Sequence, residues 1–225
     1  VFTSASMIGV MAGSFVGGVL ASWYGWRWAF AAVGVVGLPL ALLVWFTLRD
    51  PQRGASDGML DTAPVPFLTA MRQIVGSPVL LLLILSYAFL VFMLFGVITW
   101  FPALMVRLHG LGLARVGMQF GLALGLGTAL GGIAGGSIAN RLAARNLTWL
   151  TRLPLISMCL LWPLYQTAIF APTPQVALVF VAMVAAVGGA AVGPALAAMQ
   201  MVLPAPIRAK AAAFNGFIAS LTGIG

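Results

Sequence analysis

Residues 117–145 form an apolar run that constrains the fold of this chain more than any other stretch. The run carries no charged residue before Arg141 and is longer than the roughly 20 residues with which an α-helix crosses a bilayer. A soluble helix of this length would carry a charged face, so the run predicts a membrane span. Arg141 and Arg145 close it and mark one membrane surface, because a cation in hydrocarbon is costly.

Glycines recur at four-residue intervals along this run. The two series are Gly117, Gly121 and Gly125, followed by Gly127, Gly131 and Gly135. Because residues four apart share one face of a helix, each series forms a smooth stripe that another helix can approach closely. Such a helix, ending in fixed cations, is typical of a moving joint in a transporter. An ordinary glycine-rich span with a basic loop explains the pattern equally well.

The composition places the chain in a membrane. Charged residues make up 6% of the 225 residues and hydrophobic residues 62%, whereas a soluble domain carries about 25% charged residues. We therefore predict an all-α fold, a polytopic membrane helix bundle. The net charge of +8 comes from basic residues that stand singly or in small groups between apolar runs. This distribution indicates topology signals and contact with the lipid bilayer, and no nucleic-acid partner is expected.

Seven apolar stretches are predicted as spans, the last of them cut short. They cover about residues 2–22, 29–48, 79–104, 117–145, 153–170, 176–203 and 211–225. Because the chain begins and ends inside apolar stretches, we expect a fragment of a longer membrane protein. Pro102 is expected to mark the end of the third span, and Gly193-Pro194 to break the sixth. The alternate loops richer in Lys and Arg are expected to be cytoplasmic.

Residues 50–76 form the longest polar stretch and hold all the acids of the chain, Asp50, Asp57 and Asp61. The second part of this stretch has apolar residues on one helical face, which predicts a short amphipathic helix lying on the membrane surface. These residues are Phe67, Leu68, Met71, Ile74 and Val75. The helix either couples two halves of the protein or is a linker with an apolar side.

Short loops, a long central cytoplasmic loop and glycine-striped spans on both sides of it resemble the major facilitator superfamily (MFS). Residues 136–145, GSIANRLAAR, resemble the family's cytoplasmic signature GxxxD(R/K)xGR(R/K). Gly136, Arg141 and Arg145 match the signature, whereas Asn140 replaces its acid and so removes a charge. Residues 13–18 resemble the glycine-rich motif of the fifth span. Residues 100–141 resemble the Spinster-like branch, whose animal members export lysophospholipids and sphingolipids.

The resemblance implies a partial MFS transporter fold, spans five to eleven of twelve. Residues 1–48 would be the last two spans of the N-terminal bundle, 49–78 a cytoplasmic inter-bundle loop with the amphipathic helix, and 79–225 a truncated C-terminal bundle. It also implies a multi-pass secondary transporter of the cell (inner) membrane, working by alternating access. Glycine stripes on spans five and eight would then form a sliding contact between the bundles. The expected conformational or gating residues are Gly13, Gly17, Gly131, Gly135, Gly136, Asn140, Arg141 and Arg145.

Polar and aromatic residues within the spans are the candidates for lining a substrate cavity. They are Tyr87, Phe92, Phe95, Thr99 and Gln200. Packing alone is the commoner role of any single residue of this kind. An aromatic and methionine-rich lining favours a small amphipathic or apolar organic solute over a sugar, whose hydroxyls need many polar partners. An MFS carrier of a polar metabolite or organic anion is the alternative, and a structural or receptor-like membrane protein is a more distant one.

The predicted spans contain neither an acid nor a histidine, and His109 is placed in a glycine-flanked loop. An intramembrane enzyme needs such groups, so no enzymatic activity, catalytic residue, metal site or cofactor is expected. A proton-coupled carrier usually places a carboxylate in the membrane. A coupling proton or ion would therefore act through residues outside this chain, or the transport is uncoupled.

Overall fold

The structure is a computed structural model and describes residues 9, 13, 16–21, 23–47 and 65–224. Every regular element in these ranges is helical, which confirms the predicted all-α helix bundle. The elements are α2 (Trp26–Thr47), α3 (Phe67–Gly76), α4 (Pro78–His109), α5 (Leu113–Ala143), α6 (Trp149–Ile169), α7 (Pro174–Val202), η1 (Ala205–Ile207) and α8 (Arg208–Ile224). Four of them, α2, α4, α5 and α7, are long and apolar enough to cross a membrane. The boundaries of the predicted domains at 48 and 78 stay a prediction.

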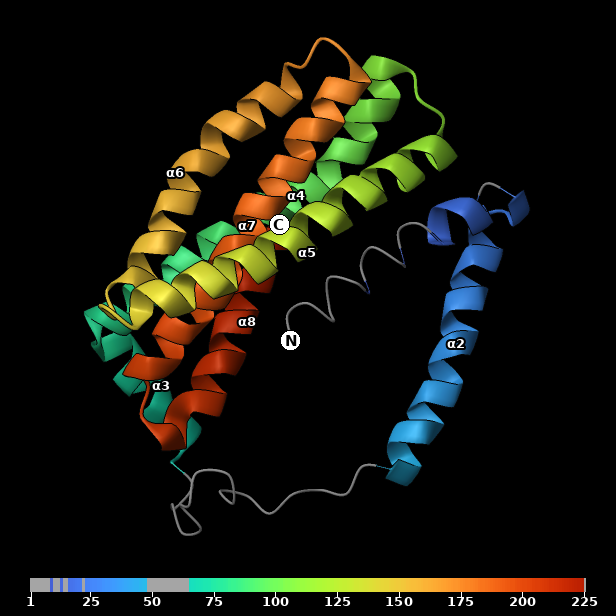
Figure 1. Cartoon of the computed structure of the whole chain (residues 1–225). Helices are drawn as coiled ribbons and strands as arrows, with labels where there is room; N and C mark the ends of the chain where they lie inside the picture. Colours follow the sequence, from blue (N-terminus) through green and yellow to red (C-terminus); the bar gives the residue numbers. More distant parts are fainter. Residues whose placement is uncertain (1–8, 10–12, 14–15, 22, 48–64, 225) are drawn as a thin grey trace.

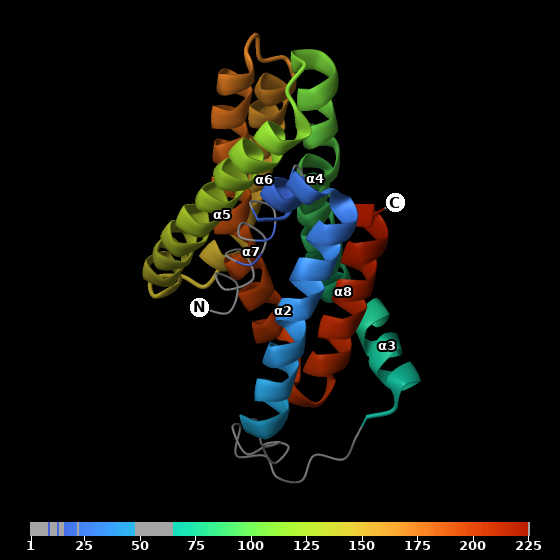
Figure 2. The ribbon, with the colours of Figure 1, turned by 90° about the vertical axis from the view of Figure 1, so that its right-hand side faces the viewer.

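Helices α4 to α8 pack into one bundle, whereas α2 stands apart from it (Figure 1). Within the bundle, α5 crosses α7 in the most extensive helix pairing, α6 packs along α7, and α8 packs along α4. The short helix α3 lies beside α8 (Figure 2). This arrangement puts α7 and α8 next to α4.

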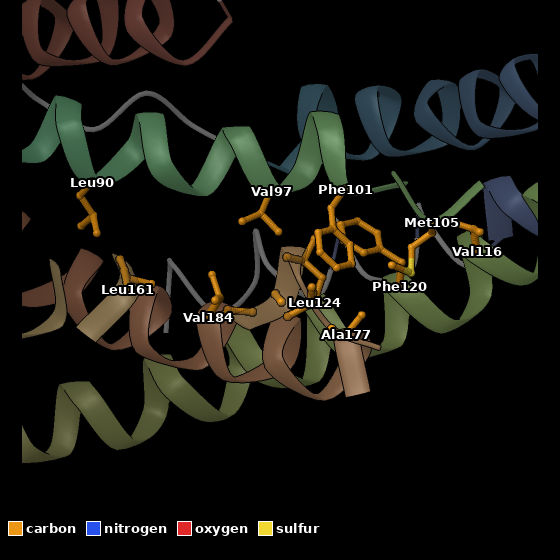
Figure 3. Close-up of a cluster of buried hydrophobic side chains, with 14 of the residues drawn as sticks. Leu90, Val97, Phe101, Met105, Val116, Phe120, Leu124, Leu161, Ala177 and Val184 are labelled. Carbon is orange, nitrogen blue, oxygen red and sulfur yellow. The ribbon is translucent and has the colours of Figure 1, made fainter. Parts of the chain in front are cut away.

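The largest core cluster lies where α4 faces α5 and α7, and its side chains point toward one another between the helices (Figure 3). It includes Leu90, Val97, Phe101, Met105, Val116, Phe120, Leu124, Ala177 and Val184. The rings of Phe101 and Phe120 stack with their centroids 6.0 Å apart. In lipid, close van der Waals packing of this kind holds helices together, because the surrounding tails are as apolar as the side chains.

Two helices continue through the prolines that were predicted to end or break them. Helix α4 runs past Pro102 to His109, and α7 is one helix on both sides of Pro194. Both predictions were wrong. A proline within the helix removes only one N–H donor, whereas ending the helix inside the membrane would leave several backbone groups without partners, because no water is present there. Continuing the helix therefore costs less. His109 accordingly lies in the last turn of α4, not in a loop. That helix ends at Gly110, whose φ of 64° is a left-handed cap that glycine adopts without strain.

The predicted amphipathic helix is present as α3, but its buried face is narrower than expected. Ala70 and Ile74 are fully buried where α3 packs on α4 and α8. Three of the five residues predicted on its apolar face, Phe67, Leu68 and Val75, are exposed. The ammonium of Lys210 in α8 donates a hydrogen bond to the carbonyl oxygen of Val65, just before α3. The helix is therefore held against the bundle by apolar packing and by one charged contact.

Candidate substrate cavity

A cavity of about 400 Å³ lies between α4, α7 and α8. Helix α4 contributes residues spaced three and four apart, which share one helical face. They are Tyr87, Val91, Leu94, Phe95 and Ile98. Helix α7 contributes a second face with the same spacing, consisting of Val192, Leu196, Met199 and Gln200. Of the residues on these two faces, only Tyr87 and Gln200 have polar side chains.

The third wall comes from α8 and consists mostly of small residues. They are Ala212, Asn215, Gly216, Ala219 and Ser220. Because small side chains do not fill the space opposite the large residues of α4, the cavity stays open between them. None of the described residues that line it is charged. The site can therefore bind an apolar body through contact and a few polar groups through hydrogen bonds.

Three of the five predicted substrate-lining residues, Tyr87, Phe95 and Gln200, lie together in this cavity. Phe92 lies on a different side of α4, where it is exposed and stacks on Phe89 with the ring centroids 6.3 Å apart. Thr99 is exposed and is absent from the described lining of the cavity. The role of these five residues in substrate binding stays a prediction.

Sequence reasoning missed the contribution of α8, because it treated residues from 211 onward only as the start of a truncated span. The signal was Asn215, an amide in an apolar helix, where an unpaired polar group is costly. Asn215 is only 3% exposed, and its Oδ1 atom accepts no hydrogen bond from any residue that the structure describes.

One glycine series of α5 forms a close seam with α7. A methyl group added at Gly131 would lie 2.5 Å from the Cα atom of Ala186. One added at Gly135 would lie 2.5 Å from the Cβ atom of Ala190. Gly127 faces Ala182 in the same way, so glycines and alanines at equal four-residue spacing meet backbone to backbone.

The predicted close helix approach is therefore present, but its partner corrects our expectation. This series contacts α7 within the same bundle, so it does not form the sliding contact between bundles. The reason is that α7 has its own stripe of alanines at the spacing of the glycines, which allows the shortest backbone separation. The gating role of Gly131 and Gly135 stays a prediction.

Gly117, the first member of the other glycine series, lies close to the helical residues 16–21. A methyl group added at Gly18 would lie 3.2 Å from the Cα atom of Gly117. This contact joins the predicted spans five and eight, although it uses Gly18 instead of Gly13 or Gly17. Those two glycines line a cavity of about 280 Å³ together with residues of α2. A methyl group added at either of them would meet nothing within 4 Å.

The predicted cations lie at the end of α5, with Arg141 in its last turn and Arg145 just after it. Asn140, Arg141 and Arg145 are exposed, and a methyl group added at Gly136 would meet nothing within 4 Å. An arginine contact with a helix-end carbonyl is found elsewhere, where Arg208 Nε donates to the carbonyl oxygen of Leu203, 3.1 Å away at the end of α7. All three acids of the chain fall in residues 48–64, outside the described residues. Within the described ranges, no three His, Cys, Asp or Glu side chains gather as a metal site would require.

Comparisons with known proteins agree with this architecture. The model of the Major Facilitator Superfamily matches residues 1–225. An "MFS-type efflux pump" of Mycolicibacterium smegmatis is 30% identical over 222 residues, which are 98% of this chain and 49% of that protein. This chain therefore spans about half the length of the curated relative it matches.

The fold also resembles crystal structures of a bacterial homologue of the human lysosomal transporter Spinster. The inward-facing, unoccupied form has a TM-score of 0.66 and 23% identity over 95% of this chain and 50% of that chain. The inward-facing, occupied form has a TM-score of 0.67 and 24% identity over 95% of this chain and 48% of that chain. At identities below 25% the likeness shows the fold alone. The part of each solved chain that is matched, about half, fits a partial MFS helix bundle.

Proposed function

Because this chain belongs to the Major Facilitator Superfamily, we propose that the protein it is part of is a secondary transporter of a small amphipathic or apolar organic solute. Two bundles would rock about a midplane site by alternating access, and the cavity between α4, α7 and α8 would form one wall of that site. The observation that carries the proposal is this cavity of about 400 Å³ with an uncharged, mostly apolar lining.

The chemistry of the lining supports an amphipathic solute over the alternatives. A sugar loses hydrogen bonds from every hydroxyl when it leaves water, and the described lining offers only Tyr87, Gln200, Asn215 and Ser220 as polar side chains. An organic anion carries a net charge and would need a cation of the protein as partner, whereas a zwitterionic head group brings its own counter-charge. No described lining residue is charged. The aromatic rings of Tyr87 and Phe95 suit an acyl chain or a ring system.

Export is the direction we propose, in the cell membrane. The support is the relative from Mycolicibacterium smegmatis, which is named an efflux pump. The sequence resemblance to the Spinster-like branch, whose animal members export lysophospholipids and sphingolipids, points the same way. A coupling proton or ion would use residues beyond this chain, and no enzymatic step is part of the proposal.

The test is transport by the full-length protein in proteoliposomes, with a fluorescent lysophosphatidylcholine and radiolabelled sucrose as the two solutes. We expect transport of the lysolipid and none of the sugar. Phe95→Ala should lower lysolipid transport by roughly tenfold, the equivalent of one aromatic contact of about 1.4 kcal/mol. Phe217→Ala is the matched control, because Phe217 lies on α8 and is 62% exposed. Transport of sucrose alone, or an equal loss in both variants, would contradict the proposal.

A further inference from the structure

We propose that Asn215 selects solutes that carry a neutral hydrogen-bond donor, an N–H or O–H group, by accepting a hydrogen bond from that donor in the cavity. The inference rests on the transporter function proposed above and adds one chemical feature to the solute. Asn215 thereby becomes a specificity-determining residue of the site.

The first observation is the state of the Asn215 side chain. It lies in the middle of α8, lines the cavity and is only 3% exposed. Its Oδ1 atom is buried and has no donor among the described residues. A buried amide oxygen without a donor is rare in folded proteins. It loses its hydrogen bond to water on burial, and no bond within the protein offsets that desolvation cost. Such an atom in a cavity wall is explained when a ligand supplies the missing donor.

The second observation is the surroundings of this atom. Ala211 and Ala219 lie one helical turn away on either side, and their methyl side chains offer no donor. On α4, Val91 and Leu94 are apolar lining residues. The other polar lining residues, Tyr87, Gln200 and Ser220, differ from Asn215 because all three are more exposed, so water can satisfy them. The selective effect therefore concentrates at Asn215.

The third observation is the absence of charge from the described lining. A cationic donor such as an ammonium would be desolvated there without a counter-charge, which is far more costly than desolvating a neutral group. A hydroxyl or a secondary amide on an apolar body has a smaller desolvation cost, and it regains one hydrogen bond by donating to Asn215. The solute we infer is thus apolar over most of its surface, with one neutral donor.

The experiment compares two probes that differ in a single N–H group. N-decylacetamide has one amide donor, and N-decyl-N-methylacetamide has none. Their binding to the full-length protein in detergent is measured by calorimetry. We expect the protein to bind the secondary amide fivefold to tenfold more tightly, roughly the effect of one hydrogen bond. Asn215→Leu should erase this preference and leave the affinity of the tertiary amide in place.

Two further variants separate selection from structure. Asn215→Ser keeps a side-chain acceptor and should retain part of the preference, with a melting temperature that reports folding. Asn146→Leu is the matched control, because the Oδ1 atom of Asn146 already accepts a bond from the Thr148 amide, 2.9 Å away in an exposed turn. It should leave the ratio of affinities unchanged.

Each alternative outcome counts against the proposal in a distinguishable way. If Asn215→Leu weakens both probes equally and keeps their ratio, Asn215 has only a structural role. If the unsubstituted protein binds both probes with equal affinity, the selection is refuted while the transporter proposal stands. If neither probe binds, this inference falls, and lysolipid transport in proteoliposomes decides the transporter proposal separately.

Discussion

Helix α7 meets its neighbours in two opposite ways. Along α5, its alanines face glycines of equal spacing, and the two backbones touch without leaving space. Toward α4 and α8, its larger residues Leu196 and Met199 border a cavity of about 400 Å³. Small residues occur on both sides, since the α8 wall is also rich in alanine and glycine. The two sides differ in the residues that the small ones face. Where small residues face small residues, the helices pack closely. Where small residues face large ones, space is left for a solute.

The comparison teaches that a glycine stripe does not by itself mark a moving contact. The series at Gly127, Gly131 and Gly135 lies inside one bundle and acts there as a packing surface. Motion between bundles, as proposed here, would involve the looser approach of Gly18 to Gly117. The two regions should therefore respond to the same type of substitution in different ways.

The largest effect is expected when the seam is broken. Gly131→Ala places a methyl group 2.5 Å from the Cα atom of Ala186, where only backbone could give way. Overpacking of this kind should lower the free energy of unfolding by about 3 kcal/mol. Gly136→Ala is the control, because its methyl group meets nothing within 4 Å and alanine favours helix by about 1 kcal/mol. Equal apparent melting temperatures for the two variants in detergent would show that the seam is not tightly packed.

The second effect separates function from fold. Gly216→Leu adds a large side chain at a lining position of the cavity where a methyl group would meet nothing within 4 Å. We expect the melting temperature to stay within a few degrees of the unsubstituted protein, while transport of the lysolipid in proteoliposomes is abolished. Retained transport at full rate would mean that the solute does not pass through this cavity.

The bundle could be predicted from sequence because its signals are strong and local. Long apolar runs specify helices wherever water cannot satisfy the backbone. The spacing of the glycines predicted a close contact, but it could not name the partner. That depended on Ala182, Ala186 and Ala190 of α7, which repeat at the same interval on a distant segment.

The cavity could be predicted only in part. Tyr87 and Phe95 stood out as aromatic residues in an apolar run, and both line it. Phe92 stood out as a further aromatic residue and Thr99 as a polar one, but at 100° per residue each lies more than 100° around the helix from Tyr87. A sequence does not say which face of a helix that is apolar all round meets the cavity. Asn215 was missed because its helix seemed incomplete.

The smallest effect is expected at the contact that holds α3 to the bundle. Lys210→Met removes the hydrogen bond to the carbonyl oxygen of Val65 but leaves the apolar packing of Ala70 and Ile74. The free energy that holds α3 against the bundle should fall by about 1 kcal/mol, which is typical of one charged contact near a surface. Faster amide hydrogen exchange confined to α3 would report it. Lys210→Arg should restore most of the protection, and an unchanged exchange rate in Lys210→Met would contradict the role of this contact.

The central claim is that the cavity between α4, α7 and α8 holds the solute, and protection of an introduced thiol tests it most directly. Ala212→Cys places a thiol in the cavity wall and Phe217→Cys places one on the same helix outside it. Both are made in the full-length protein after Cys159 and any other native cysteine have been replaced by serine. The account predicts that N-decylacetamide slows maleimide labelling at position 212 and leaves position 217 unaffected. Equal labelling rates with and without the amide at position 212 would contradict it.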